Sequence, residues 1–333
     1  MSILPLGLRQ AFGQLAEHQA RNALAARSSA ITAGYKARQN SSQTLLTADD
    51  ALAYAFARMP ATYAATAQAL HRIVEVMPEF EPRSLLDVGC GPGTASFAAR
   101  EVFQTVSDIT LMDRNGPFIA LAKTLFDATL PDISVQITAE DIVAPKPFPK
   151  VDLVVASYVL AELKSDVQAA LVQRMWEATD HLLLLVEPGT PDGFRRLREA
   201  RIALVSQGAS VVAPCTHQGA CMMAENNWCR FMARVQRSRD HKALKGATVP
   251  YEDEPYAYLA VTKDKVTNRL SHRITGRASG NKYEIRLPMC GTDGLSTLKV
   301  PTRQKELFKH FKRLDWGDAV LNPIQEAQAK HQI

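Results

Sequence analysis

Hydrophobic and polar positions follow two different patterns on either side of residue 84. Before it, the chain is rich in Ala, Leu and Gln, and its apolar residues recur at helical spacing. After it, short apolar runs alternate with helical segments, which is the pattern of a parallel sheet with crossover helices. We therefore expect an N-terminal helical subdomain followed by a doubly wound α/β core.

The first residues predict an amphipathic helix. Its apolar positions are Ile3, Leu6, Leu8, Phe12 and Leu15, with Leu24 later. The region up to Gln39 is poor in acidic residues and carries several arginines, which also fits a mitochondrial presequence. We favour the folded helix, and a bacterial cytoplasmic protein over a protein of the mitochondrial matrix. A polar break at 40–43 precedes a second helical region, with Thr47 and Asp49 as capping candidates.

Apolar runs after residue 84 locate the strands of the core. The predicted strands are 85–88, 109–112, 133–137, 153–156 and 182–186. Two later runs, 256–262 and 282–287, are expected to complete the sheet as an antiparallel pair. The longest nearly uncharged run in a strand region, 153–161, is far shorter than the roughly 20 apolar residues that cross a bilayer. We therefore expect no membrane partner.

The same patterns divide the chain into five expected parts. These are an N-terminal helical subdomain (1–80), the core (81–205), a cysteine-containing basic insertion (206–250), the terminal strands (251–300) and a basic tail (301–333).

A predicted buried strand runs into a glycine-rich turn and then a helix between residues 85 and 94. Gly89, Gly91 and Gly93 form a G-x-G-x-G series rather than the dinucleotide pattern G-x-G-x-x-G. Glycines let the backbone approach a ligand closely, and the following helix N-terminus favours a negative group. With Asp87 before the first glycine, the series resembles motif I of class I methyltransferases. The resemblance implies an S-adenosylmethionine site in which Asp87 orients the amino group of the cofactor.

Further polar residues follow the next strands, where ligands of this fold class bind. Asp113 lies 20 residues after Gly93 and matches motif II, whose carboxylate accepts the ribose hydroxyls. Glu140 and Asp141 follow the third strand and are either adenine contacts or a solvated loop pair. Ser157 ends the fourth strand beside the expected place of methyl transfer.

The chain lacks the tetrads Asn-Pro-Pro-Tyr and Asp-Pro-Pro-Tyr, which hold an amino nitrogen for methylation. It also has no cysteine near the ends of strands four or five to attack a pyrimidine. The sequence therefore assigns no catalytic residue and leaves open whether methyl transfer occurs.

Cysteines are concentrated after the predicted core. Cys215, Cys221, Cys229 and Cys290 are separated by 5, 7 and 60 residues, and no secretory signal favours disulfides. A soft thiolate tetrad suits zinc or an iron–sulfur cluster, whereas unligated buried thiols are the alternative. His217 is interpreted as a polar loop residue.

Charge is distributed unevenly along the chain. Residues 230–313 hold 19 Lys and Arg against 8 Asp and Glu, a net charge of +11, and the rest of the chain carries −6. Such asymmetry fits nucleic acid as a partner, and a solvated basic face is the alternative.

The cysteine segment resembles the methyltransferase-like protein 17 family. The resemblance is carried by Pro214, Cys215, Thr216, His217, Cys221, Trp228, Cys229, Arg230, Phe231, Arg234, Arg237, Lys242 and residues 251–254. That family comprises mitochondrial small-ribosomal-subunit assembly proteins and bacterial relatives, and the likeness covers most of the chain. The family usually has Cys-Pro-His and Trp-Cys-His-Phe, whereas this chain has Cys-Thr-His and Trp-Cys-Arg-Phe. Neither difference removes a thiol.

The resemblance implies a 4Fe-4S cluster on Cys215, Cys221, Cys229 and Cys290, with zinc as the alternative. It also implies rRNA of the small ribosomal subunit as the partner of a basic helix over 230–245. The residues of that helix expected to contact RNA are Arg230, Arg234, Arg237, Arg239, Lys242 and Lys245. A second basic segment holds Arg303, Lys305, Lys309, Lys312 and Arg313.

The leading hypothesis is an assembly factor, monomeric off the ribosome. An active rRNA methyltransferase is the second hypothesis. The basic stretch and the cysteine insertion disfavour a third, a small-molecule methyltransferase.

Overall fold

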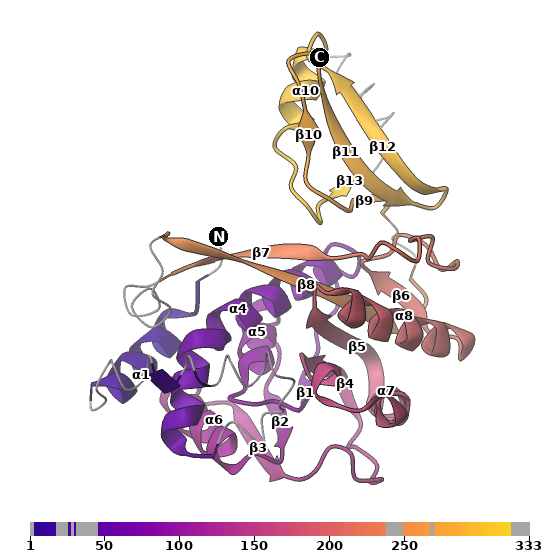
Figure 1. Ribbon diagram of the computed structural model, residues 1–333. Coiled ribbons are helices and arrows are strands. Elements are labelled where there is room, and N and C mark those ends of the chain that lie inside the picture. The colour runs from indigo at the N-terminus through magenta and orange to yellow at the C-terminus, as the bar shows by residue number, and fades with distance from the viewer. Residues whose placement is uncertain are drawn as a thin grey trace. The chain divides into compact units, whose positions relative to one another are not determined.

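The computed structural model describes residues 3–17, 26–27, 30, 46–237, 249–266 and 270–320. The chain forms two compact units, and Figure 1 labels their elements. Unit 1 comprises Met1–His71, Phe80–Glu187 and Ala233–Glu254, and unit 2 comprises Arg72–Glu79, Pro188–Met232 and Pro255–Ile333. The five-part division expected from the sequence stays a prediction.

A parallel sheet forms the centre of unit 1, with the strand order β3-β2-β1-β4-β5. Its strands are β1 (Ser84–Val88), β2 (Asp108–Asp113), β3 (Ser134–Ala139), β4 (Val151–Ser157) and β5 (Thr179–Pro188). Helices α5 (Thr94–Val102), α6 (Gly116–Thr129) and α7 (Ser165–Ala178) follow β1, β2 and β4, and the short 3-10 helix η1 (Leu160–Glu162) lies after β4. The predicted strands are confirmed, and so is the Rossmann-like fold of the class I methyltransferases.

Two helices precede this sheet in the chain. Helix α1 (Leu6–Ala16) confirms the predicted helix, because Leu8 and Phe12 are buried and the helix packs against α6. Ile3 and Leu6, also predicted for the apolar face, are exposed. Helix α4 (Ala48–Val74) begins with a reciprocal cap, because Asp50 N donates to Thr47 Oγ1 and Thr47 N donates to Asp50 Oδ2. Thr47 is therefore the cap. Leu24 and the polar break at 40–43 lie outside the described residues.

Unit 2 contains helix α8 (Pro191–Ser206), strand β6 (Ser210–Ala213) and a separate five-stranded sheet. The strands of that sheet are β9 (His272–Ile274), β10 (Ser279–Gly280), β11 (Glu284–Gly291), β12 (Gly294–Pro301) and β13 (Ala319–Val320). Helix α10 (Lys305–Phe311) buries Leu307 and Phe311 in the core of this sheet. None of the helices in the described part of the chain is long and apolar enough to span a membrane.

Half of the expected terminal strand pair is confirmed. The run 256–262 lies in strand β8 (Tyr251–Thr262) of the eight-stranded sheet that contains β1 to β5, and there it pairs antiparallel with β6. The other half is wrong, because the run 282–287 falls in β11 of the small sheet. The short connection between β11 and β12 explains the difference. Strand β11 alternates buried and more exposed residues and is joined to β12 by two residues, so the two strands pair with each other as a hairpin rather than with a distant strand.

The expected basic helix is also wrong where the structure describes it. Phe231–Gln236 is strand β7, in which Phe231, Ala233 and Val235 are buried while Arg234 and Gln236 are exposed. This alternation has the two-residue period of a strand, which the spacing of the arginines alone concealed. Residues 238–248, including Arg239, Lys242 and Lys245, lie outside the described residues.

Candidate functional site

The glycine loop between β1 and α5 adopts a backbone that only glycine tolerates readily. Gly89, Gly91 and Gly93 all have positive φ, at 70°, 53° and 81°. A Cβ added to Gly89 would lie 2.6 Å from Val159 Cγ2, and one added to Gly93 would lie 2.5 Å from Phe126 Cε2. Gly89 N also donates to Met112 O, which ties the loop to the end of β2. The loop is therefore both tightly turned and closely packed.

Two carboxylates hold this loop, the buried Asp87 and the half-buried Asp113. Asp87 Oδ2 accepts bonds from Ser96 N and Ser96 Oγ, at 3.1 and 2.7 Å. The pKa of Asp87 is raised to about 7, chiefly by burial and also by the nearby Asp113, whereas the hydrogen bonds from Ser96 oppose the rise. Asp113 Oδ2 accepts from Gly91 N at 2.9 Å, and burial raises its pKa as well. The carboxylates of Asp87 and Asp113 therefore fix the conformation of the glycine loop.

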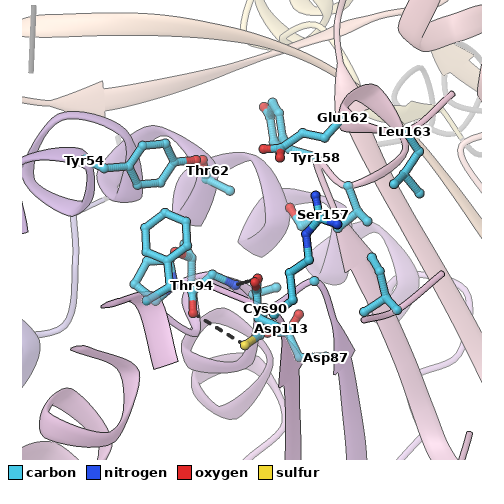
Figure 2. Close-up of a pocket in the computed structure, with 18 of the residues that line it drawn as sticks. Tyr54, Thr62, Asp87, Cys90, Thr94, Asp113, Ser157, Tyr158, Glu162 and Leu163 are labelled. Carbon is cyan, nitrogen blue, oxygen red and sulfur yellow. Dashed lines mark hydrogen bonds between the residues drawn. The ribbon is translucent and has the colours of Figure 1, made fainter. Parts of the chain in front are cut away.

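A cavity opens beside the loop within unit 1, and we call it the glycine-loop cavity. Figure 2 shows Asp87, Cys90 and Asp113 at its base. Of the predicted cofactor residues, six line it: Asp87, Gly89, Gly91, Asp113, Asp141 and Ser157. The other two, both within the described residues, do not line it. Gly93 packs under Phe126, and Glu140 forms an ion pair with Lys146.

Helix α4 supplies a wall of this cavity that sequence reasoning missed. Tyr54 and Thr62 project from it, opposite Tyr158 and Glu162 (Figure 2). Thr66 on the same helix bonds Ser157 through their hydroxyls at 3.0 Å. No motif marks these α4 residues, so only the folded chain brings them to the site.

Tyr158 is the strained residue of the site, with a φ of 63° directly after β4. Its hydroxyl donates to Glu254 Oε1 at 3.0 Å, and Arg58 Nη2 donates to the same oxygen at 3.1 Å. This network fixes the strand end from which Ser157 reaches the cavity. A left-handed tyrosine is a signal of function that sequence cannot display.

Four thiols line a second cavity, within unit 2. The residues are Cys215, Cys221, Cys229 and Cys290, and we call it the cysteine cavity. His217 Nε2 lies 3.9 Å from Cys290 Sγ. Cys90 is elsewhere, buried in the glycine loop.

The buried thiols of the cysteine cavity raise one another's pKa. Burial raises the pKa of Cys229 well above its usual range, and Cys215, Cys221 and Cys290 raise it further. Burial also raises the pKa of Cys215, while the adjacent Arg201 opposes the rise. Across the described residues, no group of three or more His, Cys, Asp or Glu side chains is close enough to hold a metal ion. The donor chemistry fits a thiolate metal centre, but the side chains are not closed around one.

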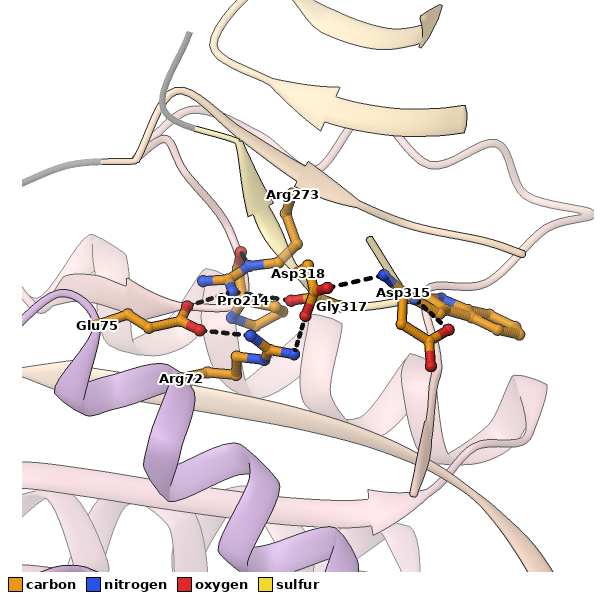
Figure 3. A network of polar contacts seen from close by, with 8 residues as sticks. Arg72, Glu75, Pro214, Arg273, Asp315, Gly317 and Asp318 are labelled. Carbon is orange, nitrogen blue, oxygen red and sulfur yellow. Dashed lines mark hydrogen bonds and ion pairs between the residues drawn. The ribbon is translucent and has the colours of Figure 1, made fainter. Parts of the chain in front are cut away.

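An ion-pair network supports one wall of the cysteine cavity (Figure 3). Buried Arg273 on β9 donates through Nη1 to Glu75 Oε2 at 2.7 Å and to Gly317 O at 3.0 Å. Its Nε donates to Pro214 O at 3.3 Å, next to Cys215. Arg72 bonds Glu75 and also Asp318, at 2.7 Å to the latter. The charges of Arg273 and Arg72 are thus matched by two carboxylates.

The described arginines predicted to bind RNA already have partners. Arg230 stacks on Trp228, with its guanidinium carbon 4.5 Å from the ring centroid. Arg234 forms a two-point bond with Asp253 at 2.7 and 2.9 Å, and Arg237 pairs with Glu252 at 3.3 Å. On and around α10 the basic residues are instead exposed and form no ion pair within the described part of the chain. They are Arg303, Lys305, Lys309, Lys312 and Arg313.

Known proteins resemble the chain over most of its length. A family model described as mitochondrial small ribosomal subunit Rsm22 matches residues 48–321. The human protein "Ribosome assembly protein METTL17, mitochondrial" is 30% identical over 299 residues, covering 82% of this chain and 63% of the relative. "Rsm22-cox11 tandem protein 2, mitochondrial" of Schizosaccharomyces pombe is 30% identical over 268 residues, covering 74% and 33%.

The chain thus spans less than two thirds of the length of these relatives. Among solved structures, magnesium protoporphyrin IX methyltransferase (ChlM) from Synechocystis PCC 6803, with bound SAM, superposes with a TM-score of 0.41 at 13% identity. The superposition covers 61% of this chain and 80% of that one.

Proposed function

The chain belongs to the mitochondrial small ribosomal subunit Rsm22 family, and from this premise we propose that it is an assembly factor of the small ribosomal subunit. The family match over residues 48–321 carries the proposal. In this proposal the factor binds rRNA, retains an S-adenosylmethionine pocket and holds a metal centre on its cysteines. The relatives named above are described as mitochondrial, which favours the mitochondrial matrix over the bacterial cytoplasm that we expected.

The glycine-loop cavity is the proposed S-adenosylmethionine site. Asp113 is the proposed acceptor for the ribose hydroxyls, and the backbone of Gly89 and Gly91 allows the cofactor to approach closely. Asp87 would orient the amino group of the cofactor, Asp141 would contact its adenine, and Tyr54 lines the wall on the α4 side. When bound, the cofactor supplies a transferable methyl group.

Calorimetry with S-adenosylmethionine tests this site. We expect Asp113→Ala to weaken binding by roughly 10- to 100-fold, the cost of removing a charged acceptor. The control is Asp108→Ala, an exposed carboxylate on the same strand whose side chain bonds only Ser107 in the described part of the chain. Failure of the unaltered chain to bind, or equal binding by the Asp113 variant, would refute the assignment.

The cysteine cavity is the proposed metal centre, a 4Fe-4S cluster with zinc as the alternative. Cys215, Cys221, Cys229 and Cys290 would hold it, and when bound it would tie the loop before β7 to β11. We expect purified protein to contain iron and acid-labile sulfide, and Cys229→Ser to lose both. Cys90→Ser, which changes the cysteine outside this cavity, should keep them. Stoichiometric zinc without sulfide would replace the cluster with the alternative.

An active rRNA methyltransferase is the second candidate. The observation that favours it is the glycine-loop cavity. A pure scaffold has no need of the positive φ angles of the glycine loop or of the carboxylates of Asp87 and Asp113. Mapping methylated rRNA positions in cells that carry Asp113→Ala distinguishes the two. Loss of one methylation favours the enzyme, and unchanged methylation with normal assembly favours the scaffold.

A further inference from the structure

The cysteine cavity carries positive charge without a carboxylate to balance it. Arg198, Arg201 and Arg273 line the cavity, whereas no Asp or Glu does so among the described residues. Arg273 is compensated from outside the cavity by Glu75. Arg201 has no such partner, because it forms no ion pair in the part of the chain that the structure describes.

Arg201 lies deep in unit 2, on α8, with only 5% of its surface exposed. Its Nη2 donates to the carbonyl oxygens of Gly219, at 2.5 Å, and His217, at 3.3 Å. Its Nε is buried with no hydrogen-bond partner. Burying a guanidinium without a counter-charge is strongly unfavourable, so the position indicates a negative group at this cavity, which no carboxylate among its described lining residues supplies.

Tyr258 gives the same indication independently. Its ring lines the cysteine cavity from β8, its side chain is 3% exposed, and its hydroxyl is buried without a partner. A buried O–H left unpaired costs free energy that a bound acceptor would recover. A neutral apolar ligand would leave both Arg201 Nε and this hydroxyl unpaired.

We infer that the cysteine cavity is completed by an anionic, sulfur-rich group, for which Arg201 provides the counter-charge and Tyr258 a hydrogen bond. The inference rests on the proposed thiolate centre. Four thiolates exceed the charge of the metal or cluster core that they hold, so the assembled centre is negative. Arg201 and Tyr258 are therefore positioning residues, which act on the centre through charge and hydrogen bonding rather than as its ligands.

Conservative variants separate charge from packing. Arg201→Gln removes the charge, Arg201→Lys keeps it, and Tyr258→Phe removes only the hydroxyl. The control is Arg195→Gln on the same helix, because Arg195 is exposed and pairs with Asp192 and Glu199. The probes are Co²⁺ alone, measured by its thiolate charge-transfer absorption, and iron with sulfide, followed by potentiometric titration. Thermal unfolding of each metal-free variant reports whether it folds.

We expect Arg201→Gln to weaken Co²⁺ binding by roughly tenfold and Arg201→Lys to stay close to the unaltered protein. In the reconstituted cluster, Arg201→Gln and Tyr258→Phe should each make the midpoint potential more negative, because both remove stabilisation of the reduced, more negative state. Arg195→Gln should change neither quantity.

Different results overturn the two proposals. A protein that binds Co²⁺ through thiolates, weakly in Arg201→Gln, but assembles no cluster would sink the 4Fe-4S proposal and leave this inference standing. Unchanged Co²⁺ affinity and unchanged potential in Arg201→Gln and Tyr258→Phe would overturn this inference while the cluster remained. If the unaltered protein binds neither Co²⁺ nor iron with sulfide, both the proposed metal centre and this inference are contradicted.

Discussion

At the scale of single residues, Gly93 is required for packing and not for lining the glycine-loop cavity. Its φ is 81°, and a Cβ added there would lie 2.5 Å from Phe126 Cε2, so Ala is strained at this position. We expect Gly93→Ala to lower the free energy of unfolding by about 1–3 kcal/mol in urea titrations. Gly116→Ala is the matched control, since nothing lies within 4 Å of its added Cβ. Equal stability of the two variants would contradict this explanation of the third glycine.

Asp87 predicts a pH dependence of stability. Its pKa is about 7 in the folded chain and about 3.9 in an unfolded one. Between these two values the folded state keeps a proton that the unfolded state releases. The contribution of protonated Asp87 to the free energy of unfolding is therefore complete below about pH 4 and is lost as the pH rises through 7. Urea titrations from pH 4 to 8 should show this loss, and Asp87→Asn should flatten the curve. An identical slope in the variant would exclude Asp87 as the cause.

Sequence could predict the residues of the site that belong to a motif, and little beyond them. Asp87, Gly91 and Asp113 gather as expected because each directly follows or ends a predicted strand. Tyr54 reaches the same cavity from a helix that lies before the first strand in sequence, and no spacing rule connects the two. Contacts made by tertiary packing have no local signature.

At the scale of elements, α10 is the described basic surface best suited to RNA. Leu307 and Phe311 point into the core, whereas Lys305 and Lys309 are exposed one turn apart. Like charges at this spacing destabilise a helix by about 0.2–0.5 kcal/mol, a repulsion that the proposed rRNA partner would relieve. In β7, by contrast, the charge of Arg234 is already matched by Asp253.

The charge pattern of α10 yields a prediction for RNA binding. Changing both Lys305 and Lys309 to Glu should weaken binding to small-subunit rRNA and reduce the salt dependence by roughly one counterion for each lost contact. Arg234→Gln should have a smaller effect. Filter binding over a series of salt concentrations measures both. If Arg234→Gln weakens RNA binding more than the change of both lysines does, the RNA-binding surface lies on β7 rather than α10.

The element types show why the helix prediction failed over Phe231–Gln236. Arg230, Arg234 and Arg237 have helical spacing, but the apolar residues between them alternate as in a strand. Burial of Phe231, Ala233 and Val235 stabilises the structure more than the arrangement of exposed charges does. Apolar periodicity was the better guide in this segment, as it was for β1 to β5.

At the scale of the whole molecule, the two units carry two different sites. The apolar runs were sufficient to predict β1 to β5 of unit 1, because each of these strands is a single apolar run in the sequence. Unit 2 draws on residues 72–79, 188–232 and 255–333, and its ion pair between Glu75 and Arg273 joins residues far apart in the chain. Such pairings could not be read from hydrophobic pattern alone.

The central claim is that this chain acts on the small ribosomal subunit, and gradient sedimentation of lysates from the cells that make it tests this most directly. We predict that the chain sediments with small-subunit precursors, that changing both Lys305 and Lys309 to Glu shifts it toward the top of the gradient, and that Asp113→Ala leaves it on the particle. Recovery of the unaltered chain only at the top of the gradient, away from every small-subunit particle, would contradict the account.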